Sequence, residues 1–246
     1  MSTSRPTSTD DLRFFDPRGA IAHGANRLPH WNQSGVACFV TFRLADSIPQ
    51  ERLSAWATER RSWLTRNPPP HTAEQDREHD ESFTVRIEEW LDQGAGSCAL
   101  REPVAREIAS RVLMRFDGRR YWLHSWVEMP NHVHLLFSPL GDQTLDTLLR
   151  SWKGVSAREI NLLHGHTGDF WMRDYFDRLA RDSTHFWRCA RYIRRNPEKA
   201  KLSASAYTLY EAPFVCDFLD AERSGGTPAA VPAPDSPGRQ ECRRSV

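Results

Sequence analysis

The stretch Met129-Pro130-Asn131-His132-Val133-His134-Leu135-Leu136 carries the strongest fold signal in this sequence of 246 residues. Successive side chains of a β-strand point to opposite faces of the sheet. A strand here therefore places His132 and His134 on one face, with Val133 and Leu135 on the other. We expect the apolar pair to face the core. Two imidazoles held side by side on one strand can bind a metal ion.

This motif lies in the second strand of a predicted β-hairpin. Residues 121–127 are rich in strand-forming side chains, residues 129–131 form the turn, and residues 132–138 return antiparallel. Further signals predict a strand at residues 36–44 and helices at residues 50–66, 83–92, 103–116, 145–163 and 183–195. This order predicts an α+β fold with ferredoxin-like packing, in which helices lie on one face of an antiparallel sheet.

Composition divides the chain into three parts. Residues 1–30 form a polar lead-in, residues 31–220 form one domain, and residues 221–246 are dominated by Gly, Pro, Ser and charge, which predicts a disordered tail. Within the domain, residues 66–100 are predicted to be a variable insertion. Three consecutive prolines end the helix before it, and the nearly uniform polarity of residues 71–82 favours a loop.

The overall composition is that of a soluble globular protein. Basic and acidic residues number 33 and 32, so the net charge of +1 does not by itself indicate a nucleic-acid partner. The five cysteines form no CxxC pair, which disfavours a zinc finger and suits a reducing compartment. We find no run of apolar residues long enough to span a membrane and no secretory signal, and we expect a cytoplasmic protein.

The last predicted helix, residues 183–195, carries a second group of reactive side chains. At helical spacing, Tyr192 and Asn196 lie one turn apart beside an apolar stripe. Much of the remaining helix surface is filled by guanidinium groups, whose planar fork matches phosphate oxygens. These arginines, which we expect to contact DNA phosphates, are Arg188, Arg191, Arg194 and Arg195.

The two groups together predict phosphodiester chemistry. A metal held by His132, His134 and the amide oxygen of Asn196 keeps its full positive charge, which a substrate phosphate would balance. Such a metal polarises a phosphodiester for in-line attack. Tyr192 can attack it and form a covalent phosphotyrosine. A phenol has a pKa of about 10, so it needs help from the metal or from nearby cations.

The histidine stretch and the segment from Tyr192 to Ala200 resemble the REP-associated tyrosine transposases, single-tyrosine enzymes with a histidine–hydrophobic–histidine (HUH) motif. Residues 152–153, 159–161 and 171–181 also fit, and the resemblance covers about residues 36–215. It implies a ferredoxin-like HUH fold, Mg²⁺ or Mn²⁺ as cofactor, and a monomer or homodimer that acts on single-stranded DNA beside a hairpin. The products would be a 5′-phosphotyrosine and a free 3′-hydroxyl.

By position, the resemblance implies that His132 and His134 are metal ligands, that Tyr192 is the nucleophile and that Asn196 is the third ligand. Lys153 and Arg158 are weaker candidates for DNA contact.

Simpler interpretations remain open for each signal. The two histidines could lie on an exposed strand face without a ligand, and the arginines could be a solvated face. His164-Gly165-His166 repeats the spacing but falls in a predicted loop. Tyr175 is a rival nucleophile, although its aromatic neighbours favour packing and no amide follows one helical turn later.

Two other functions fit parts of the pattern. A hairpin-binding protein that no longer cuts DNA would share the fold, but no proposed ligand is missing here. A nucleotide hydrolase of the histidine-triad type also uses alternating histidines on a strand. It needs a third histidine where this chain has Leu136.

Overall fold

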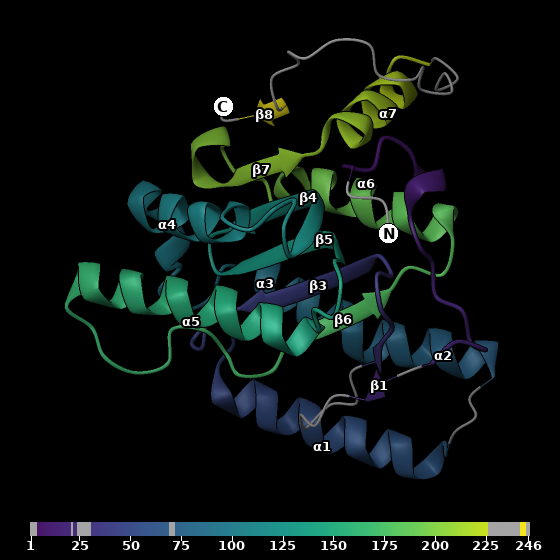
Figure 1. The fold of residues 1–246 in the computed structure, drawn as a ribbon. Helices are drawn as coiled ribbons and strands as arrows, with labels where there is room; N and C mark the ends of the chain where they lie inside the picture. Colours follow the sequence, from purple (N-terminus) through teal and green to yellow (C-terminus); the bar gives the residue numbers. More distant parts are fainter. Residues whose placement is uncertain (1–3, 21, 24–30, 69–71, 226–241, 245–246) are drawn as a thin grey trace.

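The computed structural model describes residues 4–20, 22–23, 31–68, 72–225 and 242–244 (Figure 1). At its centre is an antiparallel sheet in which the strands follow the order β6-β3-β5-β4-β7-β8. These strands are β3 (Cys38–Arg43), β4 (Tyr121–Met129), β5 (His132–Pro139), β6 (Phe176–Leu179), β7 (Thr208–Glu211) and β8 (Cys242–Arg244). A separate small sheet pairs β1 (Ala22–His23) with β2 (Trp31–Asn32).

The first four strands of this order have ferredoxin-like connectivity. Helix α4 (Pro103–Met114) lies between β3 and β4 in the sequence, and α5 (Leu145–His164) lies between β5 and β6. All of these neighbours pair antiparallel. The predicted α+β, ferredoxin-like fold is therefore confirmed.

The predicted hairpin is also present. Strands β4 and β5 are joined at Pro130 and Asn131, and the pairing begins with Met129 opposite His132. On its other side, β5 pairs with β3, where Thr41 lies opposite His134. The histidine pair therefore occupies a strand that is bonded on both sides.

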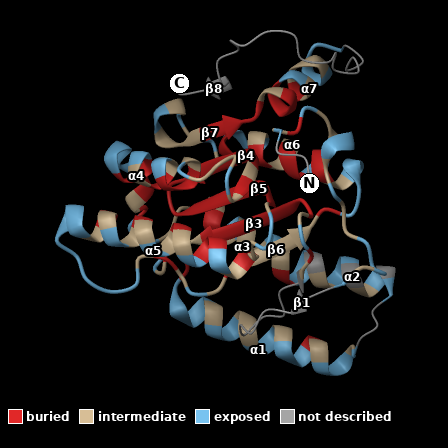
Figure 2. Ribbon diagram, in the orientation of Figure 1, coloured by how far each residue is buried: buried red, intermediate tan, exposed pale blue. Residues whose placement is uncertain are grey.

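Helices cover both faces of the sheet, whereas the sequence predicted them on one. Val133 and Leu135 pack beneath α4 and α5 in one apolar cluster. The opposite face packs against α6 (Ser183–Lys199) and α7 (Pro213–Arg223) in a second cluster. Figure 2 shows the resulting central strands as almost wholly buried. The alternation of β5 did not reveal this, because histidines normally mark a solvated face.

Helix α6 continues beyond the predicted C-terminal end. It begins after Asp182, whose side chain accepts a hydrogen bond from the backbone N–H of His185, and it continues through Pro197 to Lys199. Proline is tolerated here because the helix ends within one turn, so little of the hydrogen-bond ladder is lost. Asn196 is therefore on the same helix as Tyr192.

The insertion is helical at residues 73–82 as well, where a loop was expected, and the short helix predicted at residues 83–92 is present. After α1 (Gln50–Arg66), residues 73–92 form α2 (Ala73–His79), a π-helical segment (Asp80–Val85) and α3 (Arg86–Asp92). Phe83 is buried, and its ring packs 6.3 Å from that of Trp63. Residues 71–82 are nearly all polar and show no apolar periodicity, which is why composition favoured a loop there.

The ends of the chain are also more ordered than predicted. Arg5 of the lead-in forms an ion pair with Asp117, and the backbone of Phe15 donates to the carbonyl of Ala180 at 2.8 Å. In the tail, α7 continues to Arg223 and β8 pairs with β7, so these parts differ from the predicted disorder. The rest of the tail lies outside the described residues. Within the described part of the chain, we find no helix with the length and apolar character needed to cross a membrane.

Candidate active site

The histidine side chains share one face of β5, as expected, and point toward α6. Each is only 1% exposed. The Nε2 atoms of His132 and His134 lie 3.0 Å apart, and the ring centroids are separated by 4.6 Å. The simpler interpretation of two histidines on a solvated face is therefore wrong.

A hydrogen-bond relay fixes the orientation of His132. Asn131 donates from Nδ2 to the carbonyls of Leu91 and Ala95, at 3.2 and 3.1 Å. Its Oδ1 atom must then face Nδ1 of His132, 2.8 Å away. An amide oxygen can only accept, so Nδ1 carries the proton and Nε2 presents a lone pair. The sequence placed Asn131 only in the turn, and its role in orienting the ring was missed.

His134 has a similar partner. Its Nδ1 atom lies 2.7 Å from the hydroxyl oxygen of Thr41 on β3. The hydroxyl can accept the Nδ1 proton, and in that tautomer both Nε2 atoms present lone pairs to each other. Two lone pairs at this distance repel unless a cation lies between or beside them. Histidines that bind a metal through one ring nitrogen typically donate a hydrogen bond from the other nitrogen to a partner of this kind.

Both imidazoles are held in the neutral form. Burial lowers the pKa of His132 to about 3, and the positive charge of Lys199 contributes. Burial, His132 and Lys199 together lower the pKa of His134 well below its usual value. Neutral imidazole is the form that binds metals. The environment therefore keeps the pair ready for a metal and prevents it from acquiring charge of its own.

Helix α6 places Tyr192 and Asn196 over the histidine pair. The Tyr192 ring lies edge-on to His134, with centroids 5.0 Å apart, and also contacts Phe39 at 5.8 Å. Asn196 is 1% exposed. Neither the Tyr192 hydroxyl nor either polar atom of the Asn196 amide has a hydrogen-bond partner. Leaving such groups buried and unpaired costs ~1–3 kcal/mol each. Their presence indicates a site shaped for a ligand rather than for stability.

Helix α3 of the insertion adds carboxyl groups that the sequence analysis did not single out. Asp92 forms an ion pair with Lys199 of α6 at 2.9 Å. Burial raises the pKa of Tyr192 well above its usual value, and the carboxyl groups of Glu88 and Asp92 raise it further. The available signal was the spacing of four residues between Glu88 and Asp92 on a predicted helix, which puts both on one face.

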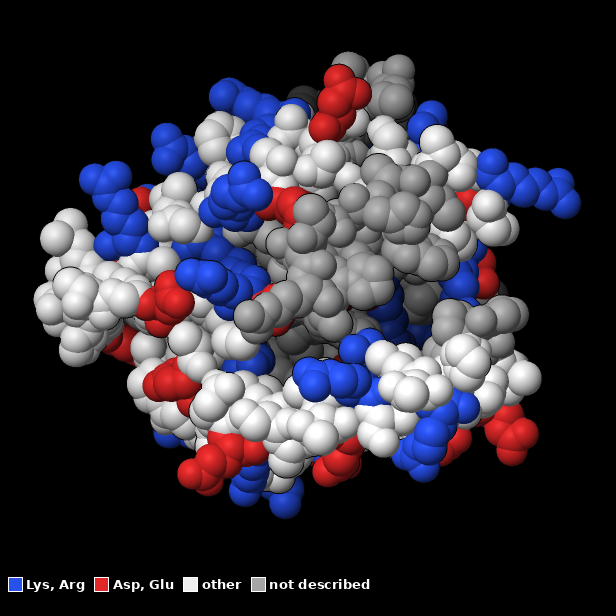
Figure 3. Space-filling model, turned by 90° about the horizontal axis from the view of Figure 1, so that it is seen from below, with Lys and Arg blue, Asp and Glu red and all other residues white. Residues whose placement is uncertain are grey.

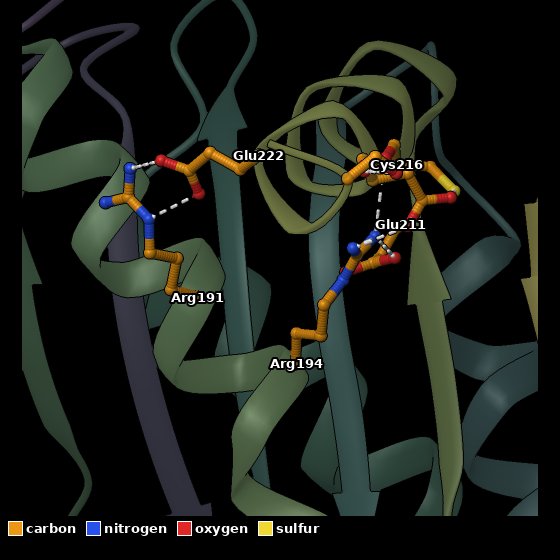
Figure 4. A network of polar contacts seen from close by, with 7 residues as sticks. Arg191, Arg194, Glu211, Cys216 and Glu222 are labelled. Carbon is orange, nitrogen blue, oxygen red and sulfur yellow. Dashed lines mark hydrogen bonds and ion pairs between the residues drawn. The ribbon is translucent and has the colours of Figure 1, made fainter. Parts of the chain in front are cut away.

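Two of the four arginines predicted to contact DNA are engaged within the protein (Figure 4). Arg194 forms ion pairs with Glu211 of β7 and with Asp220 of α7, at 2.5 and 2.7 Å. Arg191 forms a two-pronged pair with Glu222. A run of arginines on a helix does not reveal which carboxylates will pack against it. These two residues therefore fasten α6 to α7 and β7, a role that the sequence did not predict.

The other residues predicted to contact DNA also differ in whether their charged groups are engaged within the protein or exposed. Lys153 donates to the carbonyls of Met172 and Arg173, at 2.5 and 2.7 Å, and burial lowers its pKa to about 8. It supports the segment before β6 rather than offering a free charge. The side chains that remain exposed are Arg188, Arg195 and Arg158.

The face drawn in Figure 3 carries no broad, purely basic field. There the Lys and Arg side chains of the described residues are interspersed with Asp and Glu. DNA binding would therefore depend on local contacts more than on long-range attraction.

The alternative nucleophile and the second histidine pair lie away from this site, and the histidine-triad pattern lacks its third histidine. Tyr175 belongs to the cluster on the opposite face of the sheet, and its hydroxyl bonds to Asp146. His164 pairs with Glu102 at 3.0 Å beside the end of α5, as expected of a loop histidine. Leu136, the position of a third histidine in the histidine-triad pattern, is fully buried in the apolar cluster beneath α6.

The residues present fit a divalent cation if an amide completes the set. Among the described residues, no three side chains of His, Cys, Asp or Glu converge on a possible metal site. His132 and His134 supply two nitrogens, and the unpaired amide of Asn196 can supply an oxygen. A neutral set of this kind leaves the charge of the cation for an anionic substrate.

Comparison with known proteins identifies the segment that carries this site. Residues 99–196 match the model of the family described as "Transposase IS200 like", and they include the histidine pair, Tyr192 and Asn196. No curated protein matches. A solved structure, "Structure of the REP associates tyrosine transposase bound to a REP hairpin", is 15% identical with a TM-score of 0.39, covering 71% of this chain and 73% of that one.

Proposed function

We propose that this chain, whose residues 99–196 match the IS200-like transposase family model, is a transposase that cuts and rejoins single-stranded DNA beside a hairpin by way of a covalent 5′-phosphotyrosine. The observation that supports this best is the pair of unsatisfied groups on α6. The Tyr192 hydroxyl and the Asn196 amide are buried without partners, next to two neutral histidines. These groups would supply a nucleophile and a set of metal ligands at one place.

In this proposal Tyr192 is the nucleophile. Its oxygen attacks the phosphorus of the DNA backbone and displaces the 3′ oxygen, and the reverse reaction rejoins the strand. His132, His134 and Asn196 would hold a divalent cation, Mg²⁺ or Mn²⁺, whose charge polarises the phosphodiester. The edge-on packing of Tyr192 against His134 and Phe39 limits the orientations of the phenol.

The exposed arginines of α6 are proposed DNA contacts. Arg188 and Arg195 remain accessible on the helix that carries the nucleophile, and Arg158 is accessible on α5. Guanidinium groups bind phosphate oxygens in a fixed geometry. Each would position the strand without selecting its sequence.

The test is formation of a covalent adduct. The protein is incubated with labelled single-stranded DNA that contains a hairpin, in the presence of Mn²⁺, and the mixture is separated on a denaturing gel. We expect a protein–DNA adduct for the wild type, none for Tyr192→Phe, and an adduct for the matched control Tyr175→Phe. An adduct that persists in Tyr192→Phe would disprove the assignment of the nucleophile.

A second candidate is a hairpin-binding protein without cleavage activity. It is favoured by the burial of the Tyr192 hydroxyl, whose pKa is raised in this arrangement. The same experiment separates the two functions. Hairpin binding without any adduct, across Mg²⁺ and Mn²⁺, would support the binding protein.

A further inference from the structure

Helix α3 and helix α6 lie against each other through specific contacts. Asp92 pairs with Lys199 at 2.9 Å, and the end of α3 is fastened to the histidine strand because Asn131 donates to the Leu91 carbonyl. Glu88 lies one helical turn before Asp92, and Tyr192 lies two turns before Lys199. Glu88 reaches the phenol of Tyr192 directly, since these two side chains interact.

The surroundings of Glu88 keep its carboxyl group close to the reacting phenol. The charged and titratable groups that act on Glu88 are Tyr192 and Lys199 from α6, Arg178 from β6, and Asp92 from its own helix. The side chain is partly buried. The side chains of Glu88 and Asn196 act on the Tyr192 hydroxyl, but neither forms a well-aligned hydrogen bond with it. A carboxylate next to an unpaired, buried hydroxyl has the arrangement of a base beside a nucleophile.

We infer that Glu88, supplied by the helical insertion, accepts the proton of Tyr192 when the phenol attacks DNA. This inference rests on the proposed function. It assigns a catalytic task to a segment that the sequence predicted only as a short helix within a variable insertion. It also gives a reason for the contacts that hold α3 to Asn131 and Lys199.

The step balances as follows. The Tyr192 oxygen forms a bond to phosphorus, and its proton moves to the carboxylate of Glu88. The bond between phosphorus and the 3′ oxygen breaks, and that oxygen leaves with the electron pair and takes a proton from a water molecule. In rejoining, the 3′-hydroxyl gives its proton to the hydroxide left by that water molecule and its oxygen bonds to phosphorus. The bond between phosphorus and the Tyr192 oxygen breaks, and the Glu88 carboxyl group returns its proton to the departing phenolate.

The test compares Glu88→Gln with Glu89→Gln, a control that makes the same change at the adjacent, exposed position of α3. The rate constant for adduct formation is measured in a single turnover with saturating hairpin DNA and Mn²⁺. We expect Glu88→Gln to lower this rate by ~10²-fold, a typical contribution of general base catalysis. Hairpin affinity should stay within about twofold of the wild type, and Glu88→Asp should recover part of the rate.

The pH profile adds a readout that a purely structural role would not change. For the wild type we expect the rate to rise with pH and level off once Glu88 is ionised. For Glu88→Gln it should continue to rise about tenfold per pH unit, because hydroxide replaces the carboxylate as the acceptor.

The outcomes are distinguishable. A rate for Glu88→Gln equal to that of Glu89→Gln would overturn the role of Glu88 and leave the proposed function intact. A parallel loss of rate and hairpin affinity, with an unchanged pH profile, would also overturn it in favour of a structural role. Failure of the wild type to form any adduct would overturn both proposals.

Discussion

The two edges of helix α6 differ in how their polar groups are satisfied. Along the edge that faces α7 and β7, Arg191 and Arg194 are paired with carboxylates (Figure 4). Along the edge that faces β5 and α3, the Tyr192 hydroxyl and the Asn196 amide are buried without partners. One helix thus combines an edge arranged for stability with an edge arranged for binding. Residue type alone would have assigned the arginines to the substrate.

The largest effect is expected at the paired edge. Arg194→Met leaves Glu211, only 1% exposed, without its partner. Removing one member of a buried ion pair typically costs about 3–5 kcal/mol, and we expect a loss of that size in the free energy of unfolding by urea. The double variant Arg194→Met/Glu211→Leu should regain most of it, because no buried charge is left unpaired and Asp220, the other partner of Arg194, is exposed to solvent. A double variant as unstable as the single one would contradict this interpretation of the edge.

At Asn196 we expect a loss of metal affinity without a loss of stability. Asn196→Ala removes a buried amide that has no partner, so the free energy of unfolding should not fall. Mn²⁺ affinity, measured by calorimetry on the hairpin complex, should fall by at least ~100-fold. This is the largest loss typical for residues that only hydrogen-bond a metal ligand, and Asn196 is proposed to be a ligand itself. Asn161→Ala on α5 is the control and should leave Mn²⁺ affinity unchanged. Stability lost with no change in affinity would show that Asn196 is structural.

A smaller effect is expected from the partner of His134. Thr41→Val removes the hydroxyl bonded to Nδ1 while nearly preserving shape. We expect about a tenfold loss of Mn²⁺ affinity, as for other outer partners of metal-bound histidines. Thr41→Ser keeps the hydroxyl and should bind Mn²⁺ like the wild type. Equal affinities for all three proteins would mean that the hydroxyl does not orient the ring.

The smallest effects are expected from the surface arginines. Arg188→Gln should reduce the slope of log K against log salt for hairpin binding by about 0.7–0.9, the value for one lost phosphate contact. Arg191→Gln should change that slope less, because Glu222 already engages the guanidinium. Its partly exposed pair should contribute no more than ~1 kcal/mol to folding. A larger change of slope for Arg191 would show that DNA displaces Glu222.

Much of the fold was predictable from local patterns. The hairpin, the ferredoxin-like order of strands and the shared face of His132 and His134 all follow from periodicity and turn signals. The helix at residues 73–79 did not, because the polar stretch from 71 to 82 shows no apolar repeat. The covered second face was also missed, since alternation indicates which residues share a face but not what packs against it.

The sequence by itself determined which side chains share one face of a strand or helix. Backbone geometry fixes a period of two in a strand and 3.6 in a helix, so His132 stays with His134 and Tyr192 stays with Asn196 wherever these elements go. Only the tertiary structure decided that α6 lies over β5 and that carboxylates of β7 and α7 form ion pairs with Arg194. It also decided that α3 brings Glu88 toward Tyr192. Those outcomes depend on contacts between residues far apart in the chain, which no local period specifies.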